Sequence, residues 1–72
     1  MSERVTSKIK KAVDMVLELD YIMYVEIRLA RIQYQKVWDA LNELKIFDIE
    51  YLYTKVMVDD TECRLIIGAG NL

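Results

Sequence analysis

Hydrophobic residues recur at three- and four-residue steps in two parts of this chain. The first runs from Val5 to about Leu19, and its apolar positions are Val5, Ile9, Ala12, Val13, Val16 and Leu17. The second runs from Tyr34 to Leu44, and its apolar positions are Tyr34, Val37, Trp38, Leu41 and Leu44. This spacing is typical of a helix that packs one face against a core. The pattern predicts an amphipathic helix in each segment.

After Lys45 the hydrophobic period changes from about three and a half residues to two. Phe47, Ile49, Tyr51 and Tyr53 alternate mainly with polar residues, and an apolar run follows from Val56 to Val58. The polar stretch D-D-T-E at 59–62 then precedes a second apolar run, 63–67. Two alternating runs joined by a short polar segment predict a β-hairpin. The last five residues, 68–72, are predicted to form a frayed tail.

The segment from Tyr21 to Leu29 fits more than one structure. Its alternation and its β-branched and aromatic residues fit a strand. A seven-residue apolar repeat also continues from Ile9 to Leu44, which fits one long coiled-coil helix. A third possibility is a short helix over Val25–Arg31, with Ile27 and Ala30 inward. Gly, Pro, Asn, Ser and Thr, the residues that usually mark turns, are all absent between Tyr21 and Leu41. The sequence of this region therefore does not decide between the strand, the coiled coil and the short helix.

Composition limits the function classes more than it limits the fold. The chain has 72 residues, which suits one domain over 1–72, and 54% of them are hydrophobic, which argues against disorder. So small a domain has a small core, and its apolar excess predicts a homodimer. The scarcity of Asn and Gln and the absence of Pro suggest a thermophilic source.

Catalysis is not expected. The chain has no histidine, one cysteine (Cys63) and no glycine-rich phosphate loop, so His-based acid–base chemistry and Cys/His zinc sites are excluded. We therefore expect no enzyme, no cofactor, no metal and no small-molecule ligand. The uncharged run Tyr21–Val25 is too short to cross a membrane, and the N-terminus lacks the apolar core of a signal peptide. The expected compartment is the cytoplasm.

The stretch I-R-L-A-R-I-Q-Y-Q-K-V-W-D-A-L-N-E-L, followed by the hairpin, resembles the winged helix-turn-helix DNA-binding domains. The resemblance covers nearly the whole chain. It implies an α+β fold of three helices followed by a β-hairpin wing, with Ile32 buried in the turn between the second and third helices. Two features depart from the family pattern: Arg31 stands near a turn position where glycine is frequent, and the wing tip at 59–62 is acidic.

The same resemblance implies a sequence-specific contact with double-stranded DNA, as in a homodimeric transcriptional regulator. The third helix would present Gln33, Tyr34, Gln35 and Lys36 to base edges. Arg28 and Arg31 would contact phosphates from the adjacent surface, and Lys55 and Arg64 are the basic residues of the wing.

A rival interpretation gives the chain the order α-β-α-β-β in two layers. Tyr21–Leu29 is then a true strand that pairs with Cys63–Ile67. Such a protein would be a non-enzymatic interaction or assembly module that binds a protein through its sheet or its acidic hairpin tip.

Overall fold

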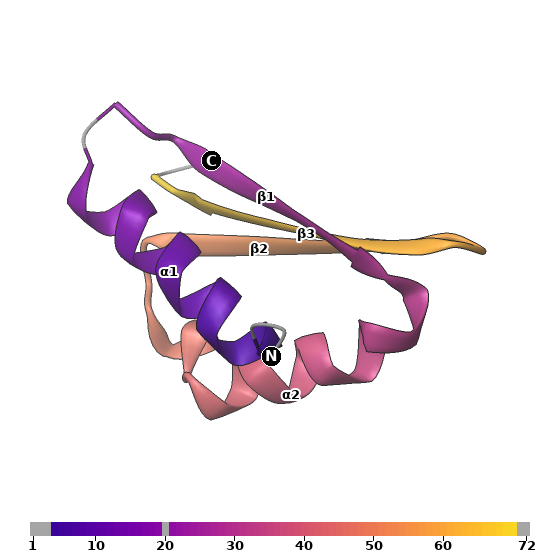
Figure 1. The fold of residues 1–72 in the computed structure, drawn as a ribbon. Coiled ribbons are helices and arrows are strands. Elements are labelled where there is room, and N and C mark those ends of the chain that lie inside the picture. Colours follow the sequence, from indigo (N-terminus) through magenta and orange to yellow (C-terminus); the bar gives the residue numbers. More distant parts are fainter. Residues whose placement is uncertain (1–3, 20, 71–72) are drawn as a thin grey trace.

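A computed structural model describes residues 4–19 and 21–70, which form two α-helices and one antiparallel sheet (Figure 1). The helices are α1 (Val5–Glu18) and α2 (Tyr34–Glu43). The strands are β1 (Tyr24–Ala30), β2 (Leu52–Val58) and β3 (Glu62–Ala69). Two short 3₁₀ turns are η1 (Arg31–Gln33) and η2 (Ile46–Asp48). The element order is therefore α-β-α-β-β, and the α+β class is confirmed.

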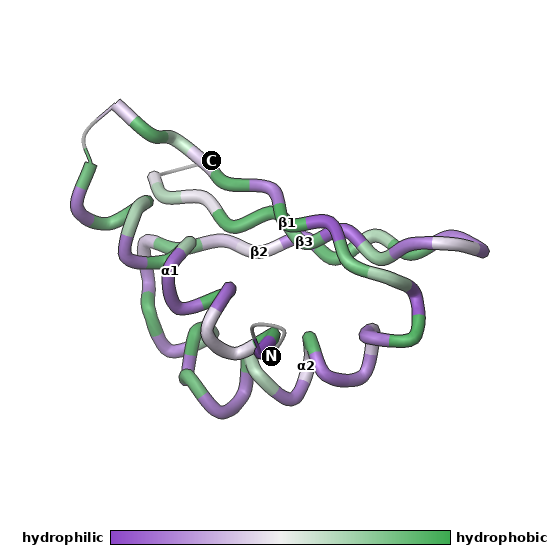
Figure 2. Tube along the Cα trace, in the orientation of Figure 1, coloured by the Kyte–Doolittle hydropathy of each residue, from purple (hydrophilic) through white to green (hydrophobic). Residues whose placement is uncertain are grey.

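Both helices lie on one face of the sheet, so the molecule has two layers (Figure 1). The strand order is β1-β3-β2, which makes β3 the central strand. Leu65 and Ile67 of β3 are fully buried against Ile9 of α1 and against Val37 and Leu41 of α2. Hydropathy alternates along β1, as expected for a strand with one face on the core and one on solvent (Figure 2).

The strand β1 corrects the prediction of three helices, because the described residues contain two. Residues 25–31 do not form a short helix, and the long coiled coil over 9–44 is interrupted here. As a strand, this segment turns Val25, Ile27 and Leu29 toward the core together. It also pairs with β3 from Tyr24 opposite Gly68 to Ala30 opposite Glu62. A helix would leave that edge of the buried central strand without hydrogen-bond partners, which is costly.

The predicted turn between two helices is also absent. Arg31–Gln33 is a 3₁₀ turn that joins a strand to α2, and Ile32 is 87% exposed rather than buried. Ala30 is likewise exposed, because it occupies a solvent-facing position at the end of β1. The apolar face predicted for α2 is correct at Val37 and Leu41, which are fully buried.

The hairpin prediction is confirmed by the pairing of β2 with β3. Its first strand begins later than predicted, because Ile46–Asp48 forms η2 after a left-handed Lys45 (φ 55°) ends the preceding helical segment. The predicted tail is wrong at Gly68 and Ala69, which belong to β3; residues 71–72 lie outside the described part. No helix in the described ranges is both long and apolar enough to span a bilayer.

Candidate functional site

The sheet has one face that neither helix covers, and we call it the open face. Because opposite residues of an antiparallel pair share a face, the register assigns each strand's contribution. From β1 it takes Tyr24, Glu26, Arg28 and Ala30; from β2 Tyr53, Lys55 and Met57; and from β3 Glu62, Arg64, Ile66 and Gly68. Three bases against two acids give this face a slight positive charge within a chain of net charge −2.

One end of the open face carries two tyrosines across a glycine. Tyr24 and Tyr53 occupy the positions on either side of Gly68 in the central strand. A Cβ at Gly68 would lie closer than 3.0 Å to Cε1, Cζ and Oη of Tyr53, so the phenol ring rests directly on the glycine backbone. Tyr24 is 59% exposed. Both rings border a shallow depression of about 480 Å³, which Ile66, Lys55 and Glu26 also line.

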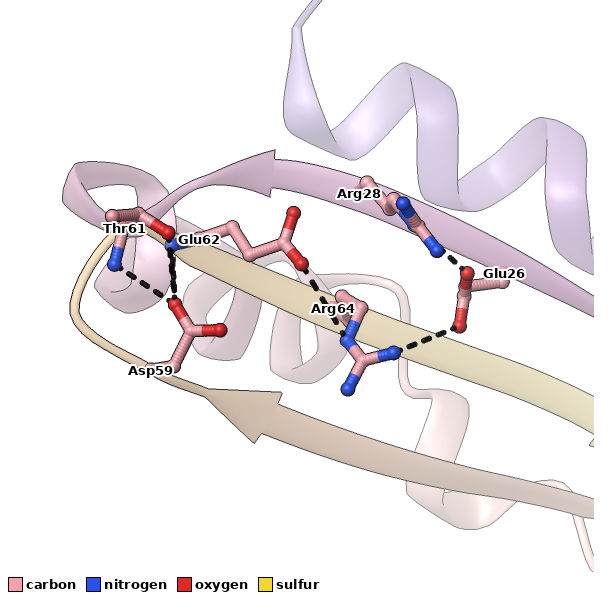
Figure 3. A network of polar contacts seen from close by, with 6 residues as sticks. All are labelled: Glu26, Arg28, Asp59, Thr61, Glu62 and Arg64. Atoms are coloured by element: carbon pink, nitrogen blue, oxygen red, sulfur yellow. Dashed lines mark hydrogen bonds and ion pairs between the residues drawn. The ribbon is translucent and has the colours of Figure 1, made fainter.

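The middle of the open face carries a small network of ion pairs (Figure 3). Arg28 and Arg64 are opposite each other in the β1–β3 register, and Glu26 contacts both. Arg28 Nε donates to Glu26 Oε1 at 3.1 Å, whereas Arg64 Nη1 lies 3.8 Å from Glu26 Oε2. Arg64 Nε also lies 3.8 Å from Glu62 Oε1. The hydrogen bond to Glu26, and then the charges of Glu26 and Glu62, raise the pKa of Arg28.

The acidic hairpin tip is held by its own first residue. Asp59 Oδ1 accepts hydrogen bonds from the backbone N–H of Thr61 at 2.8 Å and of Glu62 at 2.9 Å. The Thr61 hydroxyl donates to the same oxygen at 3.1 Å (Figure 3). These donors lower the pKa of Asp59, with the Glu62 N–H bond the largest cause. The carboxylate of Asp59 therefore has a structural role in the turn.

The structure divides the eight predicted DNA-binding residues into separate groups. Arg28, Lys55 and Arg64 share the open face. The other five lie on η1 and the first turn of α2, and they are Arg31, Gln33, Tyr34, Gln35 and Lys36.

Four of those five residues have contacts within the helical layer. Gln33 and Lys36 line a cleft of about 440 Å³ between α2 and the N-terminal end of α1. Asp39 and Glu43 of α2 line the same cleft. Gln35 Nε2 donates to Asp39 Oδ1 at 3.1 Å. The Tyr34 ring meets Trp38 edge-on with centroids 6.4 Å apart, and Trp38 stacks on Phe47.

Two residues of the tyrosine end were missed by the sequence interpretation. Tyr24 was one member of an ambiguous segment, and Gly68 was placed in a tail. The available signal was a glycine within an apolar run, which often marks the close approach of another group. Only the cross-strand register, however, identifies Tyr53 as that group.

Similarity to known proteins, the single cysteine and metal-binding groups indicate no further functional site in the described residues. No family model, curated protein or solved structure matches this chain. Cys63 is a buried free thiol, and burial raises the pKa of that thiol. Within residues 4–19 and 21–70, no group of three or more His, Cys, Asp or Glu side chains could hold a metal ion.

Proposed function

We propose that this protein is a small nucleic-acid-binding module that uses the open face of its sheet and prefers single strands to duplexes. The observation that carries the proposal is the Tyr53 ring packed against Gly68, beside an exposed Tyr24 and on the same face as three basic side chains. Aromatic platforms next to cations are the usual means of binding single-stranded nucleic acid.

The preference for single strands follows from what the tyrosines offer. Gly68 supports the half-buried Tyr53 ring, and that ring borders the shallow depression beside Tyr24, where a base can stack. Each base stacked on an aromatic side chain contributes about 1–3 kcal/mol. In a duplex the base faces are already occupied by neighbouring bases, so a flat sheet gains no stacking there. A role in transcription remains a prediction from the sequence.

The basic residues favour binding to different extents. Lys55 makes no ion pair with any described residue, so it is available to a phosphate. Arg28 and Arg64 already contact Glu26, and a phosphate has to compete with that carboxylate. Neutralising two or three phosphates on a single strand gives a log–log salt slope of roughly −1.4 to −2.1. Binding should therefore be weak at physiological salt and measurable at low salt.

The test is fluorescence anisotropy with a labelled mixed-sequence single strand of about 15 nucleotides, at roughly 50 mM salt. We expect Tyr53→Ala to weaken binding about 5- to 150-fold, the equivalent of one lost stacked base. Lys55→Ala should flatten the salt slope by about 0.7, and Lys36→Ala, its matched control on α2, should leave the slope unchanged.

Two results would count against the proposal. Absence of binding to both the single strand and its duplex, by protein that is folded by circular dichroism, would exclude a nucleic-acid function on this face. Duplex binding that is lost in Gln35→Ala or Lys36→Ala but kept in Tyr53→Ala would support the sequence-based interpretation, in which the start of α2 reads base edges.

A further inference from the structure

The outer edge of β1 is an unpaired sheet edge. In the order β1-β3-β2, no described strand lies beyond β1 (Figure 1). The Met23 carbonyl accepts from Ala69 N–H, and Arg31 N–H donates to the Thr61 carbonyl, each at 3.2 Å. Odd-numbered residues therefore direct their backbone groups toward β3. The even-numbered residues of β1 direct their N–H and C=O groups outward, where they can pair with another strand.

The sequence of β1 is Y-V-E-I-R-L-A, and its pattern of apolar and charged residues is symmetric about Ile27. Valine and leucine occupy one pair of related positions, and glutamate and arginine occupy the other. We propose that β1 pairs antiparallel with β1 of a second copy of this chain, about a twofold axis at Ile27. The two copies would then share one continuous six-stranded sheet. In that register Glu26 faces Arg28 of the second copy and Arg28 faces its Glu26, which gives two oppositely charged cross-strand pairs. On the core side, Val25 faces Leu29, and Ile27 faces its own copy.

Other registers are less favourable for a physical reason. A shift of the twofold to Glu26 places two carboxylates opposite each other, and a shift to Arg28 places two guanidinium groups opposite each other. A twofold between two residues would set a core-facing residue opposite a solvent-facing one, which the pleat does not allow. Of the registers centred on Glu26, Ile27 or Arg28, only the one at Ile27 places opposite charges across both Glu26 and Arg28 and keeps the two faces matched.

The exposed apolar residues beside β1 also favour a second copy of this chain as the partner of β1. Tyr21 and Met23, just before the strand, are 80% and 74% exposed, and Ile32, just after it, is 87% exposed. An antiparallel twofold carries the segment before β1 of one copy to the segment after β1 of the other. Tyr21 and Met23 would then meet Ile32 of the second copy, so both apolar ends become covered together. A chance partner strand would have no reason to match both ends.

The charge pairs allow a test with the intact chain in the absence of nucleic acid, so that its result is independent of the proposed function. Sedimentation velocity at roughly 100 µM should show the parent as a dimer. Glu26→Arg and Arg28→Glu each place like charges across the twofold, and each variant alone should shift strongly toward monomer. Lys45→Glu, a matched charge change away from β1, should stay dimeric.

Mixing the two variants gives the sharpest result. A chain with Glu26→Arg presents two arginines, and a chain with Arg28→Glu presents two glutamates, so their mixture should recover the dimer as a heterodimer. The doubly exchanged chain, Glu26→Arg with Arg28→Glu, should dimerise alone. A monomeric parent would overturn the proposal, and so would folded single variants that remain dimeric or a mixture that fails to recover.

A backbone variant separates the edge from the charges. Ala30→Pro, at a residue whose φ of -64° proline can adopt, removes an outward N–H of β1 without removing a bond to β3 or a charged side chain, and it should weaken the dimer while the fold persists. Thr54→Pro makes the same change on β2, whose outward positions are set by the Gly70 N–H to Tyr51 C=O bond, and it should leave the dimer intact. If the β2 variant dissociates the dimer and the β1 variant does not, the wrong edge has been assigned.

Discussion

Replacing Gly68 by alanine should separate binding from folding. A Cβ at this position would lie closer than 3.0 Å to the Tyr53 ring, at least about 0.5 Å inside normal carbon contact. The backbone of β3 cannot move away easily, because it is bonded to a strand on each side. The ring must therefore move off the glycine, and the stacking position beside Tyr24 is lost.

The two consequences of this change differ in size. Alanine gains about 0.5–1 kcal/mol over glycine in a strand, and a displaced ring costs about 0.5–1.5 kcal/mol if it leaves its rotamer. The free energy of unfolding should therefore change by no more than about 1 kcal/mol. Binding to a single strand should fall by the value of one stacked base, about 1–3 kcal/mol, or about 5- to 150-fold in Kd.

Urea unfolding and anisotropy titrations on the same preparations would measure both effects. The control is a double-mutant cycle: in a Tyr53→Ala background, Gly68→Ala should have no further effect on Kd. Tyr34→Ala, which removes a tyrosine of α2 and not of the open face, should bind like the parent. Equal binding by Gly68→Ala and the parent, or an undiminished effect in the Tyr53→Ala background, would refute the role of this ring.

Three further outcomes follow from the fold. Leu65→Ala should lower the free energy of unfolding by about 2–5 kcal/mol in urea melts, because Leu65 is fully buried in the central strand; a loss under 1 kcal/mol would contradict that packing. Ile32→Asp, measured in dilute protein, should change stability by no more than about 0.5 kcal/mol, whereas a buried residue in a helix-helix turn would cost about 3–5 kcal/mol. The lowered pKa of Asp59 stabilises the fold above about pH 4, and this contribution is lost as the pH falls through the lower folded-state pKa. Asp59→Asn should remove that part of the acid dependence of the urea midpoint between about pH 5 and pH 2. If the urea midpoints of the parent and the variant fall in parallel over this range, the role of Asp59 is rejected.

The sequence alone determined the elements whose periodicity allows one structure. Ile9, Val13 and Val16 fit only the helical stripe of α1, and the core face of α2 at Val37 and Leu41 was equally clear. The hairpin followed from two alternating runs around a polar turn. In each case the partners are close in the sequence or lie on one face of the same element, so local spacing carries the information.

Tertiary structure decided the elements whose pattern fits two periods at once. Val25, Ile27 and Leu29 satisfy both a strand and a seven-residue repeat, and β3 selects the strand because its buried backbone needs partners on both edges. Those partners lie more than thirty residues apart in the chain. The same long-range pairing exposes Ile32 and brings Arg28, Lys55 and Arg64 onto one face with Tyr24 and Tyr53. A functional surface assembled across three strands depends on register, and register is set by contacts that local patterns do not contain.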